Sequence, residues 1–130
     1  MIVDASAVIT ILRAEPEAPA MARALDREDS FRISVVNYVE AAIVIDAGRD
    51  PIASRRFDDF CRETPLIIEP VTVEQGRVAR EAYRDFGKGR HRAGLNLGDC
   101  FAYALARVTG EPLLFKGGDF GHTDIEPVER

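Results

Sequence analysis

The sequence contains little of several residue types and patterns, and each scarcity excludes a class of protein. Among its 130 residues, Cys61 and Cys100 stand alone, without a CxxC pair or a histidine at ligand spacing. A disulfide framework or a zinc site is therefore not expected. No apolar run approaches the roughly 20 residues that a membrane span requires. The apolar residues 1–12 are interrupted by Asp4 and lack the basic leading segment of a secretory signal, so we expect a cytoplasmic protein.

Positive charge is scarce overall, because 17 lysines and arginines face 22 aspartates and glutamates, a formal net charge of −5. A protein that coats nucleic acid in general needs a basic surface, so this balance argues against one. The exception is a basic run that contains Arg84, Lys88, Arg90 and Arg92 with a single opposing acid. Taken alone, such a run is typical of a solvated loop.

The order of strand-like and helix-like stretches predicts the fold class. No repeat or low-complexity tract interrupts the chain, whose length is typical of one domain. The expected strands are residues 1–3, 31–35, 65–68, 112–115 and, as a short fifth, 124–126. The expected helices are residues 5–13, 19–27, 37–47, 54–63, 72–86 and 97–108. This alternation predicts an α/β/α sandwich with a four- or five-stranded, mostly parallel sheet that carries helices on both faces.

Two of the expected helices have informative apolar patterns. In helix 37–47, Val39, Ile43 and Val44 fall on one face, which is typical of an amphipathic helix. Helix 97–108 is almost wholly apolar and contains a single charged residue in its second half. A helix that is apolar all round must be buried between neighbours, so this helix is expected to lie in the interior.

Four acidic residues follow strands or open helices, and open α/β sheets bind ligands at that edge. Asp4 ends the first strand, and Glu40 lies in the first turn of the helix after the second. Asp99 opens the apolar helix, and Asp119 follows the fourth strand in a Gly-Gly-Asp turn. Four carboxylates in a partly dry cleft repel one another, so such a cluster needs a cation. Ligand sets made only of oxygen suit Mg²⁺ or Mn²⁺ rather than zinc.

Each acid also has a purely structural explanation. Two of them stand three residues after an asparagine, the spacing of a capping box, in residues 37–40 and 96–99. Asp4 is of a type favoured at helix N-caps, and turn chemistry alone explains Asp119. The functional interpretation therefore depends on the four acids sharing one edge of the sheet.

Other classes of protein fit the residues less well. A dehalogenase-type phosphatase needs a second aspartate two residues after Asp4, where Ser6 stands. A phosphate-receiving signalling domain needs an aspartate at the end of its third strand, where this chain has Ile68-Glu69-Pro70. A serine hydrolase lacks support because no GxSxG motif occurs. A binding or dimerisation module without catalysis stays open, and it predicts that neutralising Asp99 changes no measurable property.

Three segments carry a resemblance to a known family. They read MIVDASA at residues 1–7, GLNLGDCFAYALA at residues 94–106 and PLLFKG at residues 112–117, and the tail around residues 120–125 continues the match. These segments resemble PIN-domain ribonucleases, specifically the virulence-associated protein C (VapC) toxins of bacterial toxin–antitoxin pairs. The resemblance spans the chain at matching length and implies a single PIN domain over residues 1–130.

The resemblance also implies a set of functional residues. The family's acidic quartet of metal ligands and catalytic residues corresponds to Asp4, Glu40, Asp99 and Asp119, and its small hydroxyl residue to Ser6. Relatives often carry Gly-Asp-Asp-Phe where this chain has Gly-Gly-Asp-Phe. The fourth ligand is therefore open between Asp119 and Asp124.

The activity that the resemblance implies is metal-assisted hydrolysis of RNA. One or two Mg²⁺ ions, or Mn²⁺ in their place, would activate a water and stabilise charge on the phosphate. The basic run over residues 84–92 then gains a role as a phosphate-binding loop or as an antitoxin contact. The family further implies a homodimer that a VapB-type antitoxin silences. A catalytically inactive PIN-like module is the alternative.

Overall fold

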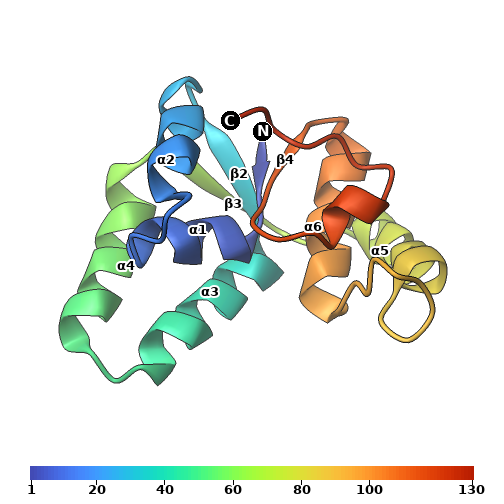
Figure 1. Cartoon of the computed structure of the whole chain (residues 1–130), viewed down its shortest axis with the longest axis horizontal. Coiled ribbons are helices and arrows are strands. Elements are labelled where there is room, and N and C mark those ends of the chain that lie inside the picture. The colour runs from blue at the N-terminus through green and yellow to red at the C-terminus, as the bar shows by residue number, and fades with distance from the viewer.

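The computed structural model describes residues 1–130 and places a parallel sheet between two groups of helices (Figure 1). The four strands, in the spatial order β3-β2-β1-β4, are β1 (Ile2–Val3), β2 (Phe31–Ser34), β3 (Leu66–Glu69) and β4 (Leu113–Leu114). The helices are α1 (Ala5–Leu12), α2 (Ala18–Asp26), α3 (Val35–Ala47), α4 (Pro51–Glu63), α5 (Val73–Phe86), α6 (Leu97–Thr109) and the short 3-10 helix η1 (Phe120–His122). The α/β/α architecture with a parallel sheet is confirmed.

The expected fifth strand is wrong. Residues 124–126 form no strand, and the tail touches β4 only through an isolated bridge between Leu113 and Pro127. Leu113 donates its N–H to Glu126 O, and Val128 donates to Leu113 O. Proline has no N–H to extend a ladder, so the pairing stops at one residue.

The sheet separates two hydrophobic cores. Helices α1 to α4 cover one face and helices α5 and α6 cover the other, left and right in Figure 1. Side chains alternate along a strand, so Ile2 enters the α5–α6 core while Val3 enters the α1–α4 core. Both side chains are fully buried. This packing fixes the direction of β1 and the position of the residue that follows it.

Helices α3 and α6 differ in how far their apolar side chains are buried. The interior position expected for α6 is confirmed, because seven of its residues are buried, among them Cys100 and Leu105. In α3, by contrast, Val39 and Ile43 are 46% and 62% exposed, and the buried positions are Asn37, Ala41 and Ile45. The buried Asn37 amide bonds to the backbone of α6, and this contact turns the apolar stripe of α3 outward.

The carboxyl ends of the strands share one edge, which we call the carboxyl edge. Helices α1 and α3 begin there, beside the first turns of α6 (Figure 1). Ligands of open α/β sheets bind at this edge. None of the helices is long and apolar enough to cross a membrane.

Candidate metal centre

Asp4 is the most deeply buried of the four acids, with 4% of its surface exposed. It is the N-cap of α1, and its Oδ2 accepts a hydrogen bond from the Ser6 N–H at 3.0 Å. Burial raises the pKa of Asp4 above its ordinary value, against the lowering effect of the Ser6 hydrogen bonds, and the charge of Glu40 raises it further. The capping role and the site role therefore coexist in one side chain.

Asp99 lies in the first turn of α6 and combines the same two roles. The capping box expected from the spacing is confirmed, because Asn96 Oδ1 accepts from the Asp99 N–H and Asp99 Oδ2 accepts from the Asn96 N–H. Burial raises the pKa of Asp99 to about 6, and the charges of Asp4 and Asp119 add to the effect. Because the interaction of two charges is mutual and the Asp99 charge also acts on Glu40, Asp99 interacts electrostatically with all three of the other acids.

Glu40 reaches the carboxyl edge from α3. Its Oε1 accepts a hydrogen bond from Asn37 Nδ2 at 2.7 Å, and the same amide donates to Gly98 O at 2.9 Å. The capping box expected for residues 37–40 is wrong, because Ser34 caps α3 and Asn37 lies inside the helix. Burial raises the pKa of Glu40, the Asn37 hydrogen bond lowers it, and the Asp99 charge raises it.

Gly98 makes room for Glu40. A Cβ at this position would overlap the Glu40 carboxyl group. Asn37 and Gly98 belong to segments with the spacing of a capping box, and that spacing did not predict that both residues support Glu40. The one signal was a glycine in the first turn of an otherwise apolar helix, directly before Asp99.

The two candidates for the fourth acid differ in their surroundings. Asp119 is exposed, precedes η1 and makes no capping hydrogen bond with its side chain. Both carboxylate oxygens of Asp124 are engaged by α6, since Oδ1 accepts from Tyr103 Oη at 2.7 Å and Oδ2 from Arg107 at 2.9 Å. Asp119 alters the pKa of Asp99, whereas Asp124 ties the tail to the second half of α6.

Ser6 contacts the loop after β4. Its Oγ accepts a hydrogen bond from the Lys116 N–H at 3.0 Å, while its own N–H donates to Asp4. The Ser6 side chain, which the family resemblance matches to a small hydroxyl residue, therefore fixes the start of the segment that leads from β4 to Asp119.

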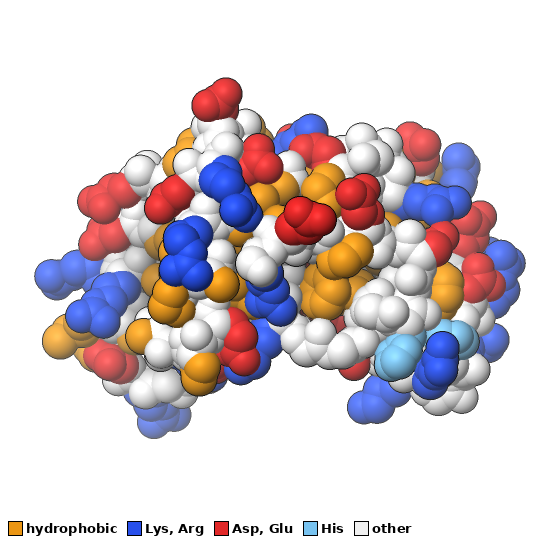
Figure 2. Space-filling model, turned by 45° about the horizontal axis from the view of Figure 1, so that its top comes forward, with side chains coloured by type: hydrophobic (Ala, Val, Ile, Leu, Met, Phe, Trp, Pro, Cys, Tyr) orange, Lys and Arg blue, Asp and Glu red, His pale blue; other side chains and the backbone are white.

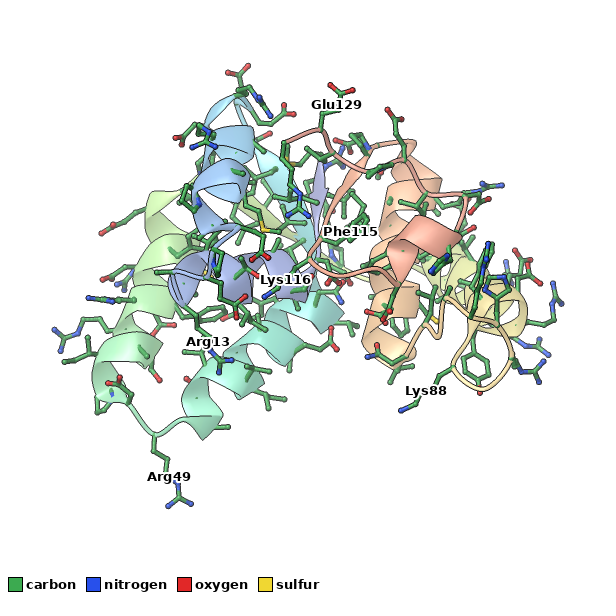
Figure 3. The ribbon with its side chains drawn as sticks, in the orientation of Figure 1. Arg13, Arg49, Lys88, Phe115, Lys116 and Glu129 are labelled. Carbon is green, nitrogen blue, oxygen red and sulfur yellow. The ribbon has the colours of Figure 1, made fainter.

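Arg84 lies in the last turn of α5, and the rest of the basic run lies in the loop between α5 and α6, which is closed by a bridge between Gly87 and Leu95. Arg90 lies over the Tyr83 ring, 5.5 Å from its centroid. Lys88 projects away from the loop tip, on the side to which the carboxyl edge faces (Figure 3). The view turned toward the opposite edge shows acidic and basic side chains interspersed, without a continuous basic surface (Figure 2).

At the carboxyl edge the four acids lie close enough for their charges to affect one another's pKa values. No group of three or more His, Cys, Asp or Glu side chains is packed closely enough to hold a metal ion as it stands. The hydrogen bonds of Asp99 to Asn96 and of Glu40 to Asn37 hold these carboxylates in place. The largest cavity, of about 530 Å³, lies elsewhere, among residues of α1, α3, α4 and the turn before α4.

Comparisons with known proteins agree with this fold. A family model for the PIN domain matches residues 1–126. Ribonuclease VapC28 of Mycobacterium tuberculosis is 54% identical over 127 residues, which cover 97% of this chain and 96% of that protein. Ribonuclease VapC42 of the same species is 48% identical over 129 residues, 98% of each chain. The chain belongs to the PIN-domain family and, within it, to the VapC ribonucleases.

Two solved structures share the fold. The crystal structure of Mycobacterium tuberculosis VapC20, described as a sarcin–ricin loop cleaving toxin, matches with a TM-score of 0.78 at 17% identity and covers 99% of this chain and 98% of that one. A toxin–antitoxin complex from Klebsiella pneumoniae matches with a TM-score of 0.71 at 15% identity and covers 95% and 92%. The family resemblance drawn from the residues is confirmed.

Proposed function

We propose that this chain is a toxin that hydrolyses RNA phosphodiester bonds at a divalent metal site formed by Asp4, Glu40, Asp99 and Asp119. The observation that carries the proposal is the placement of the acids, because the buried Asp4 caps α1 and Asp99 lies in the first turn of α6, where burial raises the pKa of both. Perturbed acids of this kind at the carboxyl edge of a parallel sheet are typical of functional sites.

The residues present fit a divalent cation. All four donors are carboxylates, and oxygen ligands suit Mg²⁺ and Mn²⁺. Lys116, which follows β4, pairs with Glu15 rather than with one of the four acids. When bound, the cation would lower the pKa of a coordinated water and stabilise charge on the phosphate. We assign Mg²⁺ as the ion, with Mn²⁺ as a substitute.

The chain's own residues supply position rather than a nucleophile. Asp4 and Asp99 are held by hydrogen bonds in the first turns of α1 and α6, so both carboxylates approach the site from fixed backbone positions. Asn37 donates to Glu40 and favours its ionised form, the form that binds metal. The nearby basic loop is suited to contact RNA phosphates.

The first test compares the two candidates for the fourth acid. Wild-type protein is expected to cut end-labelled RNA into discrete products with Mg²⁺ or Mn²⁺ and to cut none in EDTA. Asp119→Asn should lower the rate by roughly tenfold or more, because it removes a charge from the metal site. Asp124→Asn should keep the rate and lower the unfolding free energy by about 1 kcal/mol, since it weakens hydrogen bonds to Tyr103 and Arg107.

The outcomes separate the possibilities. If Asp124→Asn lost activity and Asp119→Asn kept it, the fourth ligand would be Asp124. Products that persist in EDTA would contradict a metal-dependent ribonuclease.

The basic loop is proposed to bind RNA phosphates. The double variant Lys88→Gln/Arg92→Gln should weaken RNA binding at all sequences and flatten the slope of log affinity against log salt by about one to two. Arg23→Gln/Arg49→Gln is the control, since it removes the same charge from α2 and from the turn after α3, where Arg49 points into solvent (Figure 3). Filter binding at several salt concentrations measures the slopes. Equal slopes in the two double variants would refute the phosphate-binding role.

The partners follow from the family. VapC toxins pair with antitoxins, and for this chain we propose a VapB-type protein as the antitoxin.

The homodimer stays a prediction, which sedimentation velocity of the isolated chain tests. Val39, Ile43 and Leu97 are exposed apolar side chains on α3 and α6 and would be suited to such a contact.

A further inference from the structure

The loop after β4 is tied to both ends of α1. The Lys116 N–H donates to Ser6 Oγ in the first turn of α1. The Lys116 ammonium donates to Glu15 Oε2 at 2.5 Å and lies 3.7 Å from Glu17 Oε2, both just beyond the last turn. Figure 3 shows Lys116 at the centre of the molecule, beside α1. Residues more than 100 positions apart are thereby joined next to the candidate metal centre.

Glu15 is itself fixed to α1. The chain turns back after the helix through Ala14, whose φ of 50° is uncommon for a residue with a side chain. This turn lets Glu15 donate its N–H to Thr10 O and accept from Thr10 Oγ1 at 3.1 Å. Thr10 is 1% exposed. Glu15 therefore offers Lys116 a carboxylate whose position is set by the core of the protein.

Lys116 is the last residue before Asp119 that is bonded to another element of the fold, since Gly118 O accepts only a local hydrogen bond from the Gly121 N–H. Gly117, with a φ of 101°, and Gly118 separate the two residues, and neither has a neighbour within contact distance of a Cβ. On the other side of Asp119, Phe120 is buried and packs on Phe115 with ring centroids 5.1 Å apart. Two glycines permit wide motion, so the position of Asp119 depends on these two anchors.

We propose that Lys116, held by Glu15 and Ser6, is a positioning residue that sets Asp119 relative to Asp4 and Asp99 and so determines how tightly the site binds its cation. This inference rests on the proposed function, because it assumes that the acids hold a metal. Exposed ion pairs contribute little to stability. A purely structural role therefore predicts almost no effect of breaking the pair, whereas a positioning role predicts a selective effect on the metal site.

The test uses Lys116→Met and Glu15→Gln, which break the pair from opposite sides. Each should raise the Mg²⁺ concentration for half-maximal RNA cleavage by roughly tenfold, a loss of about 1.4 kcal/mol in cation binding. The rate at saturating Mg²⁺ should stay close to that of wild type. Mn²⁺ binding to the RNA-free protein, measured by calorimetric titration, should weaken by a similar factor.

Further variants control for general damage. Asp59→Asn breaks the exposed ion pair between Asp59 and Arg62 on α4 and should leave Mn²⁺ binding unchanged. Lys116→Arg retains the charge and should restore binding. Hydrogen exchange of the amides of residues 116–119 in metal-free protein should accelerate in Lys116→Met, while exchange in the α1 core stays at the wild-type rate.

The possible outcomes distinguish failure of the positioning role of Lys116 from failure of the proposed function. If wild type binds Mn²⁺ and the two variants bind it equally well, the positioning role is wrong. If Lys116→Met weakens RNA binding while Glu15→Gln does not, Lys116 contacts RNA directly and the inference is overturned. If wild-type protein binds no Mn²⁺ and cuts no RNA, the proposed function fails, and the inference fails with it.

Discussion

Asp99→Asn is expected to abolish RNA cleavage and, at neutral pH, to make the metal-free fold more stable. The amide has nearly the shape of the carboxylate, and its oxygen can still accept from the Asn96 N–H in the capping box. The charge that attracts a cation is lost. Because a bound metal contributes several kcal/mol to catalysis, the cleavage rate should fall by roughly a hundredfold or more.

The gain in stability follows from the raised pKa of Asp99. In the folded state this pKa is about 6, against an ordinary value of 3.8, so the folded protein binds the proton more tightly. The ionised carboxylate therefore destabilises the fold fully above pH 6, and the penalty disappears as the pH falls toward 4. After discounting for solvent screening, Asp99→Asn should add about 1–2 kcal/mol at pH 7 and nothing below pH 4.

Thermal unfolding between pH 4 and pH 8 measures this difference. Mg²⁺ should raise the Tm of wild type and leave that of Asp99→Asn unchanged, because only the wild type binds it. Asp29→Asn, in an exposed segment before β2, is the matched control and should behave as wild type. Equal cleavage by wild type and Asp99→Asn would mean that the activity does not arise at this site, whereas no cleavage by either protein would favour the inactive binding module.

Local signals in the sequence were sufficient to predict most of the fold. Asn96 caps α6 as expected, and Thr72 at the start of the expected helix 72–86 caps α5, since capping depends on residues only a few positions apart. The outward face of α3 could not be predicted from periodicity. Val39 and Ile43 form an apolar stripe, but the contact that orients the helix is made by Asn37 with a residue 61 positions away.

The candidate site, like the fold, could be predicted only in part from the sequence. The meeting of Asp4, Glu40, Asp99 and Asp119 at one edge could be predicted, because it follows from strand order in a parallel sheet. The supports of Glu40 could not, because the same Asn-x-x-acid spacing has different outcomes in α3 and α6. Ser34 caps α3 one turn earlier, which releases the Asn37 side chain to reach Glu40.

Gly98→Ala is expected to separate activity from stability. The new Cβ would overlap the Glu40 carboxyl group, which is the far end of a flexible side chain and can move aside. That movement breaks the Asn37 hydrogen bond, at a cost of about 1 kcal/mol. Alanine in a helix recovers roughly 0.5–1 kcal/mol relative to glycine. The unfolding free energy should therefore stay within about 1 kcal/mol of wild type.

Activity should respond far more strongly than stability. A catalytic group displaced by about 1 Å can lower a rate a hundredfold, so Gly98→Ala should lose roughly tenfold to a hundredfold in cleavage. Gly76→Ala in α5 is the matched control, because a Cβ there meets nothing within 4 Å. It should gain stability and keep full activity. Equal cleavage by the two alanine variants would mean that Glu40 does not contribute to the reaction, since only Gly98→Ala displaces its carboxyl group.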